Sequence, residues 1–375
     1  MKLRLLAAAA AAVLALAAPA PAAPTSVDAR AYLVANASTG EVLASRNADE
    51  RVPIASITKL MTVLVALEHA RLDDIVTVQR SAAAVGESSI DLSPGDRLTV
   101  RDLIEGALVQ SANDAADALA DHVGHGNERT FVALMNAKAQ QLGLTETHFA
   151  RPDGLDASNH FSSARDVVHL AEVAMHNPEI RSVVRERTAT IEGGRRVLHT
   201  WNDLLSTFPG LIGVKTGHTG AAGWCEVAAA RGRGLTVYAV ILGSSTRSRR
   251  NADLSALLAW GLSRYRVVPV IDPGRVYARV AVGYGQAPVA LVPERVAVRS
   301  LRLGRPLVER VVAPAVAALP IHEGERLGEV RVFLNGDLIA SRPLVAARSV
   351  SRPGLGGRAA WYAGRTLHHV WSWVT

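Results

Sequence analysis

The segment from Ile54 to Arg71 constrains the fold of this chain more than any other. Its apolar residues do not follow a single stripe but occur on nearly every face of a helix: Ile57, Leu60, Met61, Val63, Leu64, Val65 and Leu67. A helix that is apolar all round has no face to present to water, so it must run through the middle of a domain. The sequence therefore predicts a central buried helix with other elements packed around it.

Strand and helix patterns on both sides of this helix predict an α/β domain of the α+β type. The expected elements are strands at 32–36 and 41–45, a mostly helical block at 100–171, strands near 212 and at 224–230 and 235–242, and a closing helix at 251–262. Strands before and after a helical block favour an antiparallel sheet with helices packed on it.

A second domain is expected after Arg264, where the composition changes. Valine and alanine alternate with polar residues over 276–282 and again over 328–340, where an Asn335-Gly336 turn interrupts the pattern. Alternation with a period of two is typical of half-buried strands. We expect a main domain at 23–264, a small all-β domain at 265–348, and a linker with a tail at 349–375.

The first 22 residues have the pattern of an export signal. Lys2 and Arg4 precede an apolar run at 5–17, and Ala20-Pro21-Ala22 supplies small residues for cleavage. The run is shorter than the ~20 residues that a membrane span needs. We expect a cleaved signal peptide and an exported chain. The lone Cys225 suits such a compartment, because it has no partner in the same chain with which to be misoxidised.

Composition also excludes several classes of protein. The net charge of +7 comes from dispersed basic residues, whereas a nucleic-acid binder shows a concentrated basic patch, so no nucleic-acid partner is expected. A single cysteine excludes a disulfide framework and cysteine-based clusters, and His122, His125 and His176 lack metal-ligand spacing. We expect neither a metal nor a cofactor.

Ser56 and Lys59 stand three residues apart at the start of the apolar helix, so both side chains lie on one face. A serine hydroxyl becomes an effective nucleophile when a neighbouring base removes its proton. Lysine can be that base when burial lowers its pKa. The helix start also offers backbone N–H groups to a developing oxyanion. The pair therefore predicts a serine nucleophile with a lysine base.

The use of lysine supports this interpretation. Of 41 basic residues only four are lysine, and two of these, Lys59 and Lys215, lie in motifs that can carry chemistry. Arginine is not deprotonated in proteins and cannot serve as a base. The second lysine begins Lys215-Thr216-Gly217, and Ser111-Ala112-Asn113 lies between the two lysine motifs, in an expected break between helices.

Together these motifs resemble those of the penicillin-recognising serine acyltransferases, in their order and rough spacing. Residues 215–219, followed by Ala222-Gly223-Trp224, and the segments 152–156 and 163–166 resemble the low-molecular-mass D-alanyl-D-alanine carboxypeptidases more closely. The resemblance covers about residues 31–262, and more loosely 320–344. It implies a β-lactamase-like serine transpeptidase domain followed by the family's C-terminal domain.

The resemblance also implies a role for each motif residue. Ser56 would attack the carbonyl between the two D-alanines of a peptidoglycan stem peptide, Lys59 would take its proton, and penicillins would acylate the same serine. The other implied residues are Ser111 as a proton shuttle, Asn113 at the substrate amide, Lys215, Thr216 and Arg250 around the substrate carboxylate, Gly217 as a close-approach position, and the backbone of His218 in the oxyanion hole. For Arg250, an exposed arginine at a helix start is the alternative.

Two other functions remain to be weighed. A β-lactamase would add a deacylating glutamate, but Glu146 lacks the sequence pattern expected around such a residue. A non-catalytic wall-binding protein would not need Ser56, Lys59 and Lys215 intact. The family often has a histidine where this chain has Asp153, and we expect a structural loop there. Whether water or an amine accepts the acyl group stays open.

The tail is expected to form an amphipathic helix. Its apolar stripe would hold Ala363, Leu367, Val370, Trp371 and Val374, its polar face Arg358, Tyr362, Arg365 and His369, and its borders Trp361 and Trp373. Such a helix can lie in the plane of a membrane surface. We expect it to hold the protein on the outer face of the cytoplasmic membrane; packing on its own β-domain is the alternative.

Overall fold

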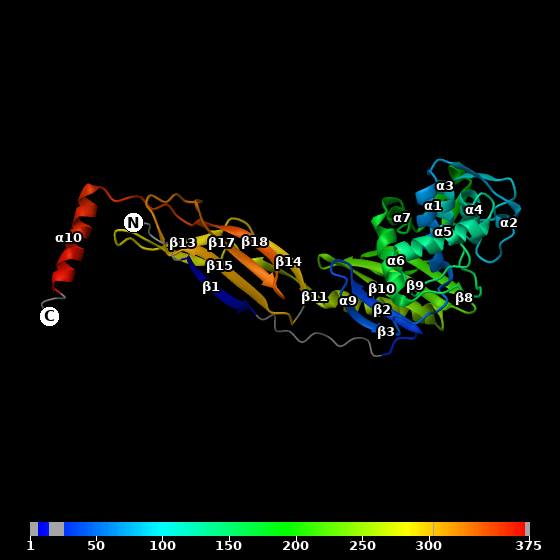
Figure 1. The fold of residues 1–375 in the computed structure, drawn as a ribbon, viewed down its shortest axis with the longest axis horizontal. Coiled ribbons are helices and arrows are strands. Elements are labelled where there is room, and N and C mark those ends of the chain that lie inside the picture. The colour runs from blue at the N-terminus through cyan, green and yellow to red at the C-terminus, as the bar shows by residue number, and fades with distance from the viewer. Residues whose placement is uncertain (1–6, 15–25, 303, 372–375) are drawn as a thin grey trace. The chain divides into compact units, whose positions relative to one another are not determined.

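The computed structural model describes residues 7–14, 26–302 and 304–371, with the backbone alone for 7–14 and 364–371. The chain divides into two compact units: residues 21–264, and residues 265–375 together with residues 1–20 (Figure 1). The first unit ends at Arg264, the residue after which the sequence changes in composition.

A five-stranded antiparallel sheet organises the unit formed by residues 21–264. In spatial order its strands are β3 (Val42–Arg46), β2 (Ala31–Asn36), β10 (Leu235–Ser244), β9 (Gly223–Gly232) and β8 (Leu211–Thr219). The two ends of the unit meet where β2 pairs with β10. The predicted antiparallel sheet is confirmed, and the predicted strands at 224–230 and 235–242 lie within β9 and β10.

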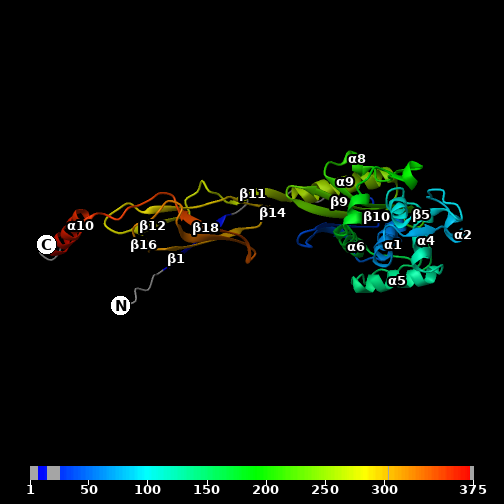
Figure 2. The ribbon, with the colours of Figure 1, turned by 90° about the horizontal axis from the view of Figure 1, so that it is seen from above.

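Helices cover both faces of this sheet (Figure 2). On β10, Val237 faces helix α9 (Arg247–Ser263), because a Cβ at Gly261 would come within 2.9 Å of the Val237 Cγ1. Its neighbour Tyr238 faces the opposite side and belongs to the large core under the helical block. Helix α9 begins earlier than predicted, since the Thr246 side chain accepts the Arg249 N–H and caps it.

The predicted central helix is confirmed. A 3₁₀ turn, η1 (Ala55–Thr58), leads into α1 (Lys59–His69), and every residue from Lys59 to Ala66 is buried. The surrounding helices are α2 (Arg80–Ala83), α3 (Val100–Leu108), α4 (Asn113–Val123), α5 (Glu128–Gln141), α6 (Ala164–His176), α7 (Pro178–Val183) and α8 (Leu204–Thr207). Thr99 and Asp102 form a capping box at the start of α3.

Two small two-stranded sheets, which the sequence did not indicate, complete this unit. They pair β4 (Ile75–Thr77) with β5 (Arg97–Thr99), and β6 (Thr188–Ile191) with β7 (Arg196–His199). Each strand has only three or four residues, too few for an alternation to be recognised in the sequence.

The second unit is built from strands, as its alternating pattern predicted. One sheet has the order β1 (Ala7–Leu14), β15 (Leu307–Pro314), β17 (Arg326–Leu334), β18 (Asp337–Ala346), β13 (Val289–Pro293), β12 (Ala278–Val282) and β16 (Val316–Ala317); a second pairs β11 (Tyr265–Ile271) with β14 (Ala297–Arg302). The Asn335-Gly336 turn joins β17 to β18. Its core is separate from that of the first unit.

The first described strand and the last helix belong to this second unit. Strand β1 pairs with β15, within the segment predicted to be a signal peptide; that prediction concerns removal of residues 1–22 and stays a prediction. The tail forms helix α10 (Leu355–Trp371), and the ring of Trp361 lies 5.5 Å from that of Tyr284, centroid to centroid. Within the described residues no helix is both long and apolar enough to cross a membrane. The predicted stripe beyond Ala363 lies outside the described side chains.

Candidate active site

The Lys59 amine lies at the centre of the candidate site. It is fully buried, and its Nζ donates to Ser56 Oγ at 2.8 Å, to Asn113 Oδ1 at 2.6 Å and to the Asp153 carbonyl at 2.6 Å. A charged amine uses all three protons in these bonds. When the amine loses one, two bonds can remain while its lone pair faces the Ser56 hydroxyl, which is the geometry a general base needs.

Burial is also what makes this lysine a plausible base. Desolvation lowers the pKa of Lys59 to about 8, against the opposing effect of nearby carboxylates, of which Asp153 and Asp117 are the largest contributors. At this pKa a useful fraction of the amine is neutral near physiological pH. The sequence-based expectation of a lysine with a lowered pKa on the apolar helix thus agrees with the geometry.

Lys215 and Ser111 form a second amine–hydroxyl pair. The Lys215 Nζ donates to Ser111 Oγ at 2.7 Å and to the Thr216 carbonyl at 2.9 Å, and its side chain is 2% exposed. Burial, and then the like charge of Lys59, holds the pKa of Lys215 well below its usual value. The hydroxyls of Ser56 and Ser111 are therefore each bonded to a buried amine.

Strand β8 lies directly against the turn that carries Ser56. A Cβ at Gly217 would come within 2.9 Å of the Ser56 backbone N and 3.0 Å of the Ala55 Cβ, so only glycine fits. The resemblance implied that this glycine makes room for a peptide; here it makes room for η1. Because of this contact, the backbone N–H of Ser56 lies beside the strand that carries Thr216 and His218.

Several backbones around the nucleophile are strained. Ala55 has φ +50°, Ser111 φ +64° and Glu87 φ +64°, in the left-handed region that non-glycine residues avoid. A Cβ at Gly154, whose φ is +86°, would come within 2.2 Å of the Ala55 carbonyl oxygen. Strain of this kind concentrates where a side chain must be held in one position for function.

Arg250 is not the exposed helix-start residue of the alternative interpretation. It is 1% exposed, its Nε lies 3.0 Å from Glu226 Oε2, and its Nη2 donates to Asn251 Oδ1 at 2.7 Å. Its guanidinium also lies over the Trp224 ring, 5.7 Å from the centroid. Burial raises the pKa of Glu226 to about 7, although Arg250 opposes this. Sequence reasoning missed Glu226, because its neighbours on β9 are plain sheet residues.

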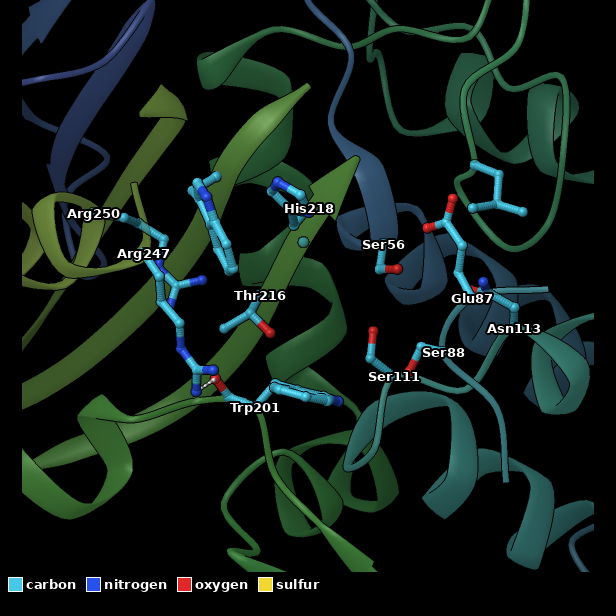
Figure 3. Close-up of a pocket in the computed structure, with 13 residues that line it drawn as sticks. Ser56, Glu87, Ser88, Ser111, Asn113, Trp201, Thr216, His218, Arg247 and Arg250 are labelled. Carbon is cyan, nitrogen blue, oxygen red and sulfur yellow. Dashed lines mark hydrogen bonds between the residues drawn. The ribbon is translucent and has the colours of Figure 1, made fainter. Parts of the chain in front are cut away.

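The predicted residues converge on one cavity of about 220 Å³ (Figure 3). Its lining includes Ser56, Ser111, Asn113, Thr216, Gly217, His218 and Arg250 from the prediction, and Glu87, Ser88, Leu155, Trp201, Trp224 and Arg247 in addition. Lys59 and Lys215 lie beneath it, bonded to the two serines. In the described part of the chain no cluster of three or more His, Cys, Asp or Glu residues could hold a metal ion.

The loop at 152–156 does more than the structural role expected for it. Its Asp153 carbonyl accepts a bond from Lys59, while its side chain receives Arg151 Nε at 3.0 Å and Nη2 at 2.7 Å. The carboxyl of Asp117, on α4, interacts with that of Asp153. Burial raises the pKa of Asp117 to about 8, and the negative charge of Asp153 is the second largest cause. Protonation of Asp117 would remove its share of the negative charge that favours the proton on Lys59.

A serine whose hydroxyl is bonded to a buried amine can attack a carbonyl carbon and form an acyl-enzyme. Here this serine lies beside a strand and next to a second amine–hydroxyl pair. Fold and site therefore define the class of active-site serine acyltransferases. The family model for peptidase S11, D-alanyl-D-alanine carboxypeptidase, matches residues 17–246. The chain belongs to this family.

Individual relatives agree with this assignment. The D-alanyl-D-alanine carboxypeptidase DacC of Escherichia coli (strain K12) is 35% identical over 377 residues, 93% of this chain and 91% of that relative. Among solved structures, penicillin binding protein 5 from Haemophilus influenzae gives a TM-score of 0.64 at 29% identity, covering 88% of this chain and all (100%) of its own. The Streptomyces K15 DD-transpeptidase gives 0.61 at 35%, covering 64% of this chain and 99% of its own.

Replacing Asp117 by asparagine should stabilise the protein increasingly as the pH rises. The folded-state pKa of Asp117, about 8, lies above its unfolded value of about 3.8, so the native carboxyl keeps its proton while the unfolded one loses it. Stability is therefore lost between these two pH values in the natural protein and not in Asp117→Asn. Thermal unfolding at pH 5, 7 and 9 should show a gain in Tm that grows with pH.

The exposed Asp73 supplies a matched control, because Asp73→Asn removes one carboxylate outside the cavity. Its Tm difference from the natural protein should stay nearly constant over the same range. A pH-independent difference for Asp117→Asn would contradict the raised pKa.

Proposed function

We propose that this protein is a serine-type D-Ala-D-Ala carboxypeptidase that removes the terminal D-alanine from peptidoglycan stem pentapeptides, and that penicillins acylate the same serine. The observation that carries the proposal is the 2.8 Å bond between Lys59 Nζ and Ser56 Oγ, with the lysine fully buried. Membership of the D-alanyl-D-alanine carboxypeptidase family supports it.

The proposed reaction starts when the neutral Lys59 amine takes the Ser56 proton and Oγ bonds to the carbonyl carbon between the two D-alanines. The backbone N–H groups of Ser56 and His218 donate to the resulting oxyanion. When this intermediate collapses, the C–N bond breaks, and the proton passes through the Ser111 hydroxyl to the leaving amine. Water then attacks the ester, which releases the shortened peptide and restores the Ser56 hydroxyl.

The proposed carboxylate subsite lies at the end of the cavity that Arg247 and Arg250 line. Thr216 would donate its hydroxyl to the terminal carboxylate, while Arg250 in the cavity wall and Lys215 beneath it would supply positive charge. Asn113 bonds to Lys59 through Oδ1 and to the Gly86 carbonyl through Nδ2, so it is fixed where it can meet the substrate amide.

The β-lactamase alternative gains no support from the geometry. Glu146, the candidate for a deacylating glutamate, forms an ion pair with Arg51 at 2.8 Å and does not line the cavity. The non-catalytic alternative leaves unexplained why two amines are buried beside two hydroxyls.

We also propose that the protein works outside the cytoplasmic membrane, exported by its first 22 residues and anchored by the tail helix. At its start, α10 is attached to its own domain, because the ring of Trp361 contacts that of Tyr284. The amphipathic pattern of the sequence after it supports a membrane-facing surface.

The Ser56→Ala variant should lose both D-alanine release and penicillin labelling, because within the described residues Ser56 has the only hydroxyl bonded to Lys59 Nζ. Mass spectrometry of muropeptides incubated with either protein measures the first, and a fluorescent penicillin the second. Residual stoichiometric labelling of the variant would overturn the assignment of the nucleophile. A shift to cross-linked products in the natural protein would show an amine, in place of water, as the acceptor.

Penicillin acylation should accelerate as pH rises from 6 to 9, with a midpoint near the Lys59 pKa of about 8, because only the neutral amine accepts a proton. Lys59→Arg should reduce the rate by about 10²-fold or more at every pH, since arginine stays protonated. Stopped-flow acylation rates test both statements. A rate that is flat with pH, or retained in Lys59→Arg, would show that Lys59 is not the base.

A chain that ends at Leu355 should be active and remain in solution. The full mature chain should instead co-sediment with vesicles that contain anionic lipid, and less so at high salt, because basic side chains contribute to such binding. A full mature chain that stays in the supernatant at low salt would contradict the anchor and favour packing on its own domain.

A further inference from the structure

Glu87 is the acidic side chain among the described residues that line the cavity, which also include two arginines, Arg247 and Arg250. Figure 3 shows the Glu87 carboxylate on the opposite side of Ser56 from both arginines. The cavity therefore carries positive charge at one end and negative charge at the other, with the nucleophile between them.

The backbone on both sides of Glu87 is fixed to the junction between α3 and α4. Asn113 donates from its backbone N to the Ser88 carbonyl at 2.8 Å and from Nδ2 to the Gly86 carbonyl at 2.9 Å. Gln110 Nε2 also donates to the Ser89 carbonyl at 2.8 Å. Asn113 in turn bonds to Lys59, so the position of Glu87 relative to the nucleophile is set by a short chain of hydrogen bonds.

The Glu87 carboxylate itself is uncommitted. The residue is exposed, and within the part of the chain that the structure describes no hydrogen bond or ion pair is made to its side chain. Its backbone nevertheless adopts a φ of +64°, which disfavours any residue with a side chain. A strained residue that holds an unpaired carboxylate in the same cavity as a reactive serine points to a ligand group of opposite charge.

The proposed function gives the direction of the substrate, and the present inference rests on it. The C-terminal carboxylate occupies the arginine end, and the scissile carbon lies at Ser56 Oγ. A peptide chain must then continue away from the arginines, and one residue advances it by at most about 3.6 Å. The residue that precedes the two D-alanines is therefore the first on the Glu87 side of Ser56 whose side chain can be longer than a methyl group.

We propose that Glu87 selects stem peptides in which the residue before D-alanyl-D-alanine carries a free ammonium group on its side chain. A carboxylate and an ammonium attract each other as opposite charges and form a charge-assisted hydrogen bond, whereas a neutral side chain adds no such attraction and an acidic one is repelled. Glu87 thus determines specificity at the end of the cavity that binds the acyl part of the substrate. The two arginines do so at the end that binds the leaving D-alanine.

Two peptides that end in lysyl-D-alanyl-D-alanine, one with the lysine ammonium free and one with it acetylated, test the proposal. The natural protein should release D-alanine from the free form with a kcat/KM about 1.5-fold to fivefold higher, the range for an ion pair at an exposed carboxylate. The preference should shrink at high salt. In Glu87→Gln it should fall to about one, while Glu87→Asp should retain part of it.

The Asp73→Asn variant is the matched control and should keep the full preference, because its lost carboxylate is exposed outside the cavity. Glu87 also contributes to the charge around Lys59, and removing it changes the rates for both peptides alike; the ratio isolates the contact with the side chain. Penicillin titration confirms that each variant is folded.

The outcomes separate the two proposals. Failure of the natural protein to release D-alanine from either peptide would overturn the carboxypeptidase function, and the role of Glu87 with it. Equal efficiency on both peptides, or a preference that persists in Glu87→Gln, would overturn the role of Glu87 alone and leave the carboxypeptidase function intact.

Discussion

The burial of one ammonium group controls the arrangement of the catalytic unit. An amine taken out of water is costly unless oxygen atoms surround it, and the three acceptors of Lys59 come from η1, α4 and the loop at 152–156. These segments must therefore keep a fixed distance from one another. The same three bonds that compensate for burial also position Ser56, so stability and reactivity depend on one set of contacts.

The parts of the fold that the sequence predicts well are those with a local pattern. The all-round apolar helix, the β9–β10 hairpin and the alternating strands of the second unit each carry their periodicity in a continuous run of residues. The lysine motifs were recognisable for a chemical reason, because lysine is rare in a chain that otherwise uses arginine, and only lysine can act as a base.

Groups whose environment comes from distant segments were not predictable in this way. Asp117 has the sequence context of a polar residue on a helix face, yet its carboxyl faces Asp153, brought there by a loop many residues later. The sequence left an exposed helix start as the alternative for Arg250, whereas the structure brings Glu226 of β9 to 3.0 Å from its Nε. Glu87 lies in a loop without periodicity, so only the bonds to Asn113 reveal its position.

The contact between Gly217 and the turn that carries Ser56 also limits which substitutions could make this enzyme less sensitive to an acylating inhibitor. A side chain added at that position would press on Ala55 and Ser56 and disturb the 2.8 Å bond between the nucleophile and its base. A substitution there that hinders an acylating drug is therefore expected to hinder turnover of the natural peptide as well. Evolutionary freedom to discriminate between a drug and a natural peptide is left to the opposite wall, where residues 86–89 are joined to the reactive centre by hydrogen bonds and not by close packing.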